Sequence, residues 1–304
     1  MKVLLFTHKI DIDGMGCAVL AKLAFGDCKI EYCETFEVNA RVKNYVESGE
    51  IYNYDKIFIT DICLKQPYID EIDKNKDVSS KLQILDHHIT EINEGNDKYS
   101  FAFIKVEDEK GKCSGTSLFY EYLKDKNILK GKQSISQFVE LTRRYDTWEW
   151  KNVYNDEKAN YLNILFTLWG VDRYVEHFKD ILIRCENFEF SSDELQSIHQ
   201  YILKVNQTCR EYLKNMRVKD YGGLKAGIVE IQNDYRNLLS QYIRDNKIDI
   251  DFVVMKILDR GTVSFRTIRS GVDVGKIAEK FGGGGHKEAS SCTVNPQISE
   301  FLEK

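Results

Sequence analysis

Residues 3–33, VLLFTHKIDIDGMGCAVLAKLAFGDCKIEYC, decide the fold class. Their two apolar runs, Val3–Thr7 and Ile30–Cys33, predict buried strands, and Gly14–Phe25 between them has a helical pattern. Strands that alternate with helices in this way form a parallel sheet in which the helices are the crossovers. The N-terminal part of the chain is therefore expected to be an α/β domain.

The same alternation continues beyond residue 33. Ile57–Thr60 and Leu82–Leu85 predict two more buried strands of the parallel sheet, and Asn39–Glu47 predicts another helix. Three further helices are expected to complete this first domain: 115–128, 135–144 and 158–181.

The length of 304 residues suggests two domains, at about 150 residues each. The first is expected over residues 1–190 and the second over 218–304, with a linker helix over 191–217 between them. Apolar residues of this helix recur in steps of three and four: Leu195, Ile198, Ile202, Val205, Cys209, Tyr212 and Met216. Such heptad spacing favours a linker helix packed against its own domains, and a homodimer through the same seam is the alternative.

The second domain is expected to be a smaller α/β unit. Its strands are predicted at Ala226–Ile231, Phe252–Leu258 and Thr262–Thr267. A helix over Val274–Phe281 follows, and a last strand is expected after the glycines Gly282–Gly285.

Composition and charge restrict the location and the partners. The chain has 43 basic and 48 acidic residues, and the first 217 residues carry 30 basic against 36 acidic side chains. A broad basic surface for long duplex DNA is thereby excluded, so any nucleic-acid substrate is expected to be short or bound at one end. No apolar run is long enough for a signal peptide or a membrane span, and the eight cysteines form no C-x-x-C pair. We expect a cytoplasmic protein with reduced thiols.

Three of the predicted strands run directly into acidic and imidazole side chains. The segments are His8-x-x-Asp11-x-Asp13, Asp61 and Asp86-His87-His88. Ligands of open parallel sheets gather beyond the carboxyl ends of the strands, so these groups are expected at one edge of the sheet. A single Asp after a strand is usually a turn or a helix cap, but three coincident clusters favour a site.

Carboxylates dominate this predicted edge, with one each from Asp11, Asp13, Asp61 and Asp86. Without cations their charges would repel one another by several kcal/mol in a partly buried site. Carboxylate and imidazole ligands suit Mn²⁺ or Mg²⁺ better than a structural zinc ion. The groups are sufficient for two ions, and such a pair supports in-line displacement at phosphorus.

A glycine-rich run, GGGGHK at Gly282–Lys287, is the second signal. Four glycines after a helix form either a C-terminal cap or a nest of uncovered backbone N–H groups that binds an anion. His286 and Lys287 add charged donors, and Arg266 on the preceding strand is a second phosphate contact if the strands align. The pattern leaves the turn and the anion site equally open.

Taken together and in this order, these motifs resemble the DHH phosphoesterase superfamily, and Ser264-x-Arg266 with Gly282–His286 resembles its DHHA1 domain. The stretch Asp11–Gly26 is most similar to the NrnB-type branch, nano-RNases that degrade very short RNA oligomers. The likeness covers nearly the whole chain. It implies an N-terminal parallel-sheet DHH domain joined by a long helix to a smaller α/β DHHA1 domain.

The resemblance also implies two Mn²⁺ ions, with Mg²⁺ as the alternative. His8 and Asp11 would hold the first ion, Asp13 the second, and Asp61 would bridge them. His87 would join the second ion together with Asp146, from Arg144-Tyr-Asp146-Thr-Trp148, which matches the family's fourth motif.

Two further residues have roles implied by the resemblance. Asp86 would ligate an ion or orient its neighbours, and His88 would face the scissile phosphate. The chain departs from several relatives between His8 and Asp11, which are separated by two residues rather than by three with a proline.

Substrate binding is implied for the second domain, which would hold a phosphate or a terminal nucleotide across a cleft. The residues are Arg266, Gly283, Gly284, Gly285 and His286. Tyr145 and Trp148 either stack on bases or belong to the core.

The implied activity is an exoribonuclease that hydrolyses short RNA oligonucleotides to mononucleotides with a metal-activated water. The alternatives are a phosphodiesterase for cyclic mono- or dinucleotides, a phosphatase for 3′-phosphoadenosine 5′-phosphate, and a non-catalytic nucleotide sensor.

Overall fold

The computed structural model describes residues 1–303 of the chain, which form two compact units. The first unit runs from Met1 to Ile198, and the second begins at His199. Within residues 1–303, no helix has both the length and the apolar character needed to cross a membrane.

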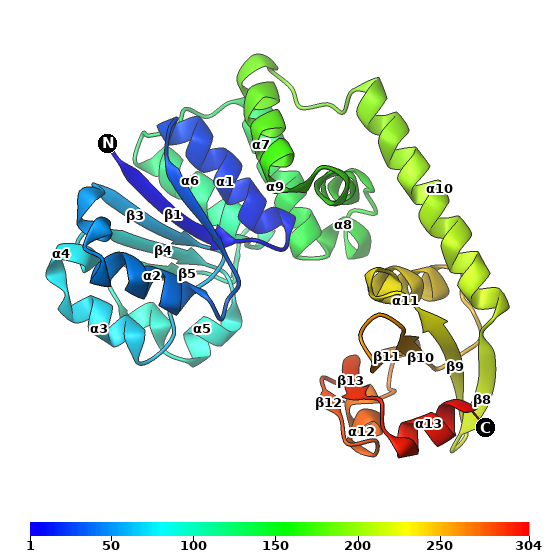
Figure 1. Cartoon of the computed structure of the whole chain (residues 1–304). Coiled ribbons are helices and arrows are strands. Elements are labelled where there is room, and N and C mark those ends of the chain that lie inside the picture. Colours follow the sequence, from blue (N-terminus) through cyan, green and yellow to red (C-terminus); the bar gives the residue numbers. More distant parts are fainter. Residues whose placement is uncertain (304) are drawn as a thin grey trace. The chain divides into compact units, whose positions relative to one another are not determined.

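The first unit is built on a five-stranded sheet in the order β2-β1-β3-β4-β5 (Figure 1). All four neighbouring pairs are parallel, which confirms the predicted α/β class. The strands are β1 (Val3–His8), β2 (Lys29–Cys33), β3 (Lys56–Thr60), β4 (Leu82–Asp86) and β5 (Ala102–Ile104). The edge strand β5 was not predicted, because three half-exposed residues give too short an apolar pattern.

Helices cover both faces of this sheet, since alternate residues of each strand point to opposite sides. Leu4 and Phe6 share one buried core with residues of α2 and α3, whereas the ring of Phe58 lies 5.1 Å from that of Phe119 of α6 on the other side. The helices of this layer are α1 (Ile12–Phe25), α2 (Val38–Glu47), α3 (Tyr68–Lys74), α4 (Lys76–Ser79), α5 (Ile89–Asn93) and α6 (Gly115–Asp125).

Three more helices follow α6 in the chain: α7 (Gln133–Asp146), α8 (Glu149–Asn152) and α9 (Lys158–Arg184). Of these, α7 and α9 pack against α1, α8 packs against α7, and the end of α7 brings a further acid toward the sheet. The structure extends α7 two residues past the predicted end, so Asp146 is its last helical residue. The chain bends within α9 at Gly170, whose φ of 71° is not helical.

The helix α10 (Ser192–Lys214) confirms the predicted long helix. In the second unit, Val205, Cys209, Tyr212 and Met216 contribute to a core with the sheet and α11. The C-terminal half of the heptad seam is therefore used within the chain, as a linker helix requires. The homodimer stays a prediction.

The second unit contains a six-stranded mixed sheet in the order β12-β13-β11-β10-β9-β8. Only β9 and β10 pair in parallel. The elements are β8 (Arg217–Tyr221), β9 (Leu224–Ile231), α11 (Arg236–Asp245), β10 (Phe252–Ile257), β11 (Thr262–Thr267), α12 (Val274–Glu279), β12 (Gly284–Gly285), β13 (Ala289–Thr293) and α13 (Pro296–Glu303). This confirms a second α/β unit and adds β8, α11 and α13, which the sequence analysis did not predict.

Candidate metal centre

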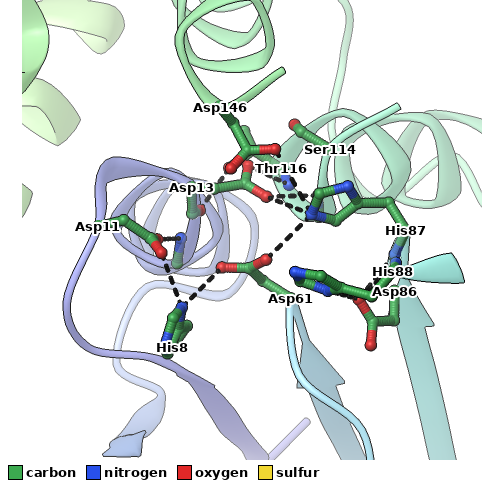
Figure 2. A network of polar contacts seen from close by, with 12 residues as sticks. His8, Asp11, Asp13, Asp61, Asp86, His87, His88, Ser114, Thr116 and Asp146 are labelled. Carbon is green, nitrogen blue, oxygen red and sulfur yellow. Dashed lines mark hydrogen bonds and ion pairs between the residues drawn. The ribbon is translucent and has the colours of Figure 1, made fainter. Parts of the chain in front are cut away.

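Asp61 lies at the middle of the site, directly after β3. Its carboxylate is 2% exposed, and its two oxygens face different neighbours: Oδ2 is 3.5 Å from His8 Nδ1, and Oδ1 is 3.3 Å from His87 Nε2 (Figure 2). The backbone φ of 61° is a left-handed conformation that few non-glycine residues adopt. Strain of this kind is typical of functional positions.

One group of ligand atoms forms at the end of β1. His8 is the last residue of that strand, and its Nδ1 lies 2.7 Å from Asp11 Oδ2. Asp11 also caps α1, because its Oδ1 accepts a hydrogen bond from the Gly14 N–H at 3.1 Å. Ligand atoms from His8, Asp11 and Asp61 all lie within 4.8 Å of one another. This group is the predicted first-ion site.

The second group joins the start of α1, the end of β4 and the end of α7. His87 Nε2 lies 3.7 Å from Asp13 Oδ2 and 3.5 Å from Asp146 Oδ2. The N-terminus of α6 fixes Asp13, whose two oxygens accept from the N–H groups of Gly115 at 2.6 Å and Thr116 at 2.9 Å. Asp13, His87 and Asp146 therefore meet as predicted for a second ion.

Asp86 and His88 form a pair beside these groups. Asp86 Oδ1 lies 2.7 Å from His88 Nδ1 and accepts from the His87 N–H at 2.7 Å. Burial would raise the pKa of Asp86, but the contacts with His88 and His87 outweigh it and lower the pKa. The His88 side chain is 46% exposed, and its pKa is raised by this hydrogen bond. Ligand atoms of Asp61, Asp86, His87 and His88 also lie within 4.8 Å of one another, so the geometry allows both predicted roles of Asp86, as a ligand and as an orienting group.

Two glycines allow the helices to approach these residues. A Cβ at Gly14 would lie 2.0 Å from the His8 carbonyl oxygen, and one at Gly115 would lie 2.6 Å from Asp61 Cβ. Any side chain at either position would push a helix away from the strand ends, so the glycines set the separation of the ligands.

Unpaired buried atoms indicate that the site fits divalent cations. Within residues 1–303, four buried ligand atoms make no hydrogen bond of regular geometry and contact only one another or other carboxylates of the site: His8 Nδ1, Asp61 Oδ2, His87 Nε2 and Asp146 Oδ2. Buried polar atoms without partners are rare, because each lost partner costs about 1–3 kcal/mol. Since the two groups face different oxygens of Asp61, the arrangement suits two ions that share this carboxylate.

Without metal, the pKa values of His8, Asp61 and Asp146 are all raised, so these side chains bind protons more tightly than usual. Burial alone would lower the pKa of His8, but Asp11 and Asp61 outweigh it and raise the pKa to about 10. Burial, and then neighbouring carboxylates, raise the pKa of Asp61; burial and Asp13 likewise raise the pKa of Asp146. Cations that enter the site must displace these protons.

Titration of the metal-free protein with Mn²⁺ at pH 7 is therefore expected to release at least about one proton, because His8 must be neutral to bind a cation. Calorimetry in two buffers of different ionisation enthalpy measures the number. The apparent affinity should rise between roughly pH 6 and pH 9, and His8→Gln should release about one proton fewer. Binding heats that do not depend on the buffer would contradict this expectation.

In the second unit, Arg266 lies on β11 in register with Ala289. Its Nη1 donates to Ser264 Oγ at 2.8 Å, and its Nη2 donates to Asn237 Oδ1 at 3.4 Å. Burial, and then the charges of Arg236 and Arg244 on α11, lower the pKa of Arg266 to about 10. Within the described chain, none of these arginines forms an ion pair with an acidic side chain, so the cluster suits an anion.

Two N–H groups of the glycine run, and that of His286, are occupied, which favours the turn over the nest, the two alternatives that the sequence left open. The N–H groups of Gly282, Gly283 and His286 donate to the carbonyls of Glu279, Ala278 and Ala289 at 3.0, 2.9 and 2.8 Å. The reason for glycine is close packing, since a Cβ at Gly283 would lie 2.2 Å from the Ser291 carbonyl oxygen. The exposed side chain of His286 offers a further donor to an anion.

Sequence reasoning from strand ends missed three residues of these sites. Asp146 ends a helix rather than a strand, and only the family resemblance identified it. Arg236 and Arg244 were missed because α11 was not predicted, although Leu238, Leu239 and Tyr242 give that segment a helical spacing.

Comparison with known proteins places these residues in a family context. Residues 2–142 match the DHH family, N-terminal domain. The chain is 31% identical over 301 residues to oligoribonuclease NrnB of Bacillus subtilis (strain 168), across 98% of this chain and 74% of NrnB.

Two solved structures share the fold. A pGpG-specific phosphodiesterase, PggH, from Vibrio cholerae has a TM-score of 0.59 and 14% identity, covering 100% of this chain and 96% of that one. The exonuclease RecJ bound to manganese has a TM-score of 0.56 and 13% identity, covering 99% of this chain and 88% of that one. At these identities the likeness supports the fold alone.

Proposed function

Since the chain belongs to the DHH family, we propose that it hydrolyses short RNA oligonucleotides to mononucleotides with two divalent ions, Mn²⁺ being the best. The phosphoesterase class follows from the family, and the preference for short RNA rests on the similarity to the oligoribonuclease NrnB. The observation that carries the proposal is the shared carboxylate of Asp61, whose two oxygens face two separate sets of ligand atoms.

The residues that would hold the ions follow from these contacts. His8, Asp11 and Asp61 would hold one, and Asp61, Asp13, His87 and Asp146 the other. Oxygen ligands with one imidazole each suit Mn²⁺. When bound, such ions lower the pKa of a water molecule and neutralise charge on a phosphodiester.

The protein's own residues position the reaction. Asp61 fixes the separation of the two ligand sets from a strained turn, and Asp86 holds His88 through its Nδ1. His88 is half exposed, so its ring can reach a phosphate oxygen and donate a hydrogen bond as negative charge develops there. No covalent enzyme intermediate is required.

The second unit would bind another phosphate of the substrate. The side chains of Arg266, Arg236 and Arg244 form a cluster of positive charge in this unit. His286, which precedes β13, adds an exposed hydrogen-bond donor. Gly283 and Gly285 would support this site through close packing against β13, and Gly284 lies between them.

Arg266→Ala and His286→Ala are each expected to lower kcat/KM on a short RNA roughly 10–150-fold, since each removes a charged contact of about 1.5–3 kcal/mol. Hydrolysis of bis(p-nitrophenyl) phosphate, which has no second phosphate for the second unit to bind, should change little. Arg269→Ala is the matched control, because Arg269 is paired with Asp249 and Asp251. Equal losses on both substrates would show that the second unit shapes the metal site itself.

A substrate panel tests the proposed function. Labelled RNA from dimers to 20-mers, cyclic di-AMP and 3′-phosphoadenosine 5′-phosphate are each incubated with the protein and Mn²⁺. We expect the dimers and trimers to be hydrolysed fastest. Faster turnover of the cyclic dinucleotide or of the 3′-phosphate would replace the proposal with the corresponding alternative, and no turnover of any substrate would favour a sensor. The cytoplasmic location stays a prediction.

A further inference from the structure

Trp148 is a bulky residue in a conformation that disfavours it. It lies two residues after Asp146, and its φ is 61°. The non-glycine residues with positive φ in the described chain are Asp61, Asn127, Trp148, Asn155 and Lys247. Asn and Asp tolerate this region best, whereas for a bulky side chain it is a genuine outlier. The ring is also 52% exposed, so neither backbone preference nor core packing explains a tryptophan here.

The ring of Trp148 ends a stack of aromatic side chains. It lies 6.4 Å from the ring of Trp150 at an interplanar angle of 29°, and Trp150 lies 6.1 Å from Tyr145 at 15°. Trp150 is 7% exposed, and its indole N–H has no hydrogen-bond partner within residues 1–303. Strain and an unpaired buried donor therefore occur within three residues, next to a predicted metal ligand, which is typical of a functional segment.

Ion pairs hold this segment in place. Arg143 donates to Glu149 at 2.7 Å and to the Lys112 carbonyl oxygen at 2.8 Å. It also pairs with Glu140 at 2.8 Å. Since two residues of chain span at most about 7 Å, the backbone of Trp148 stays within one nucleotide's reach of Asp146.

We propose that Trp148 is a stacking platform for the nucleobase beside the scissile phosphate. This inference rests on the proposed function and adds a determinant of substrate choice to it. The exposed ring extends the stack of Trp150 and Tyr145, and every nucleobase has a π-face that can continue such a stack. Stacking can accept any base of the RNA substrate, but the larger purine rings should bind more tightly than pyrimidines.

The test pairs a variant with a substrate that lacks the base. Trp148→Ala should lower kcat/KM on a diadenosine ribonucleotide roughly 5–150-fold, the range of about 1–3 kcal/mol for one stacked base. The loss should fall mainly on KM. On a dinucleotide analogue with abasic riboses, wild type and Trp148→Ala should react equally. Equal losses on the two substrates would overturn the proposal, because they would show a structural role.

Trp148→Asn separates binding from folding. Asn suits the left-handed backbone, so this variant should match or exceed the wild-type melting temperature while its KM rises as in Trp148→Ala. The control is Ile183→Asn, another exposed apolar residue of the first unit, 59% exposed at the end of α9. A wild-type KM in Trp148→Asn would also overturn the proposal.

A binding measurement keeps this inference distinct from the proposed function. The Asp61→Asn variant serves as an inactive background, in which binding of an adenosine dinucleotide should quench tryptophan fluorescence. Adding Trp148→Asn to this background should raise the dissociation constant by the same factor by which Trp148→Asn alone raises KM. If wild type does not hydrolyse RNA but this binding difference is found, the proposed function fails and the platform stands. If wild type hydrolyses RNA and no difference is found, the platform fails alone.

Discussion

Asp61→Asn is expected to lower kcat/KM by at least about 10³-fold, or about 4 kcal/mol, on short RNA and on bis(p-nitrophenyl) phosphate alike. The substitution removes the carboxylate that faces both ligand sets. Asparagine is the informative replacement, because it keeps the shape of the side chain and tolerates the φ of 61° better than alanine. Steady-state kinetics at saturating Mn²⁺ measure the effect.

The same variant should not lose stability when metal is absent. Burial and neighbouring carboxylates raise the folded-state pKa of Asp61 above its unfolded value of about 3.9. A carboxyl of this kind reduces stability once the pH exceeds the unfolded pKa, and the neutral amide removes that penalty. In chelator, the melting temperature of Asp61→Asn should match or exceed that of wild type at pH 8.

An exposed acid provides the control for both effects. Asp27→Asn, in the turn after α1, should keep native turnover and native melting temperature. Native turnover in Asp61→Asn would refute the shared-carboxylate site. A clear loss of metal-free stability at pH 8 would show that the carboxylate is favourably paired in the fold.

His88→Ala is expected to lower kcat/KM roughly 10²–10³-fold on both substrates, because it removes a donor to the phosphate where charge develops. The bond to Asp86 raises the pKa of His88, so the doubly protonated ring persists to higher pH than in free histidine. Asp86→Asn should lose part of the same activity through a misoriented ring. The metal content of both variants should equal that of wild type.

His286→Ala is the comparison that distinguishes a histidine at the reacting phosphate, His88, from one that only binds substrate in the second unit, His286. It should affect the oligonucleotide alone, whereas His88→Ala affects both substrates. If His88→Ala instead loses bound metal, His88 is a ligand and the assignment of its role is wrong.

The parallel sheet and most of the first site were predictable from the sequence because of one physical regularity. Carboxyl ends of neighbouring parallel strands lie at one edge, so residues that end β1, β3 and β4 must meet. Asp61 accordingly contacts both His8 and His87, although the three residues are far apart in the chain. Apolar runs of four or five residues located those strands to within one residue.

The residues that were missed depend on tertiary packing. Asp146 reaches the site because α7 packs beside α1, and no periodicity in its own segment reports that contact. The N–H groups of Gly282 and Gly283 are occupied by carbonyls at the end of α12, and that of His286 by the Ala289 carbonyl where β12 turns into β13. The conformation of Trp148 is likewise set by the turn from α7 into α8, where sequence preference would place Asn or Gly.

Metal stoichiometry in the active protein tests the central claim most directly. Wild-type protein is equilibrated with Mn²⁺, separated from free ions on a desalting column, assayed, and analysed for metal by mass spectrometry, beside Asp61→Asn and Asp27→Asn. The two sets of ligand atoms around Asp61 predict about two ions per chain in wild type and Asp27→Asn, and fewer than about one in Asp61→Asn. Full activity with one ion per chain, or two ions retained by Asp61→Asn, would contradict the account.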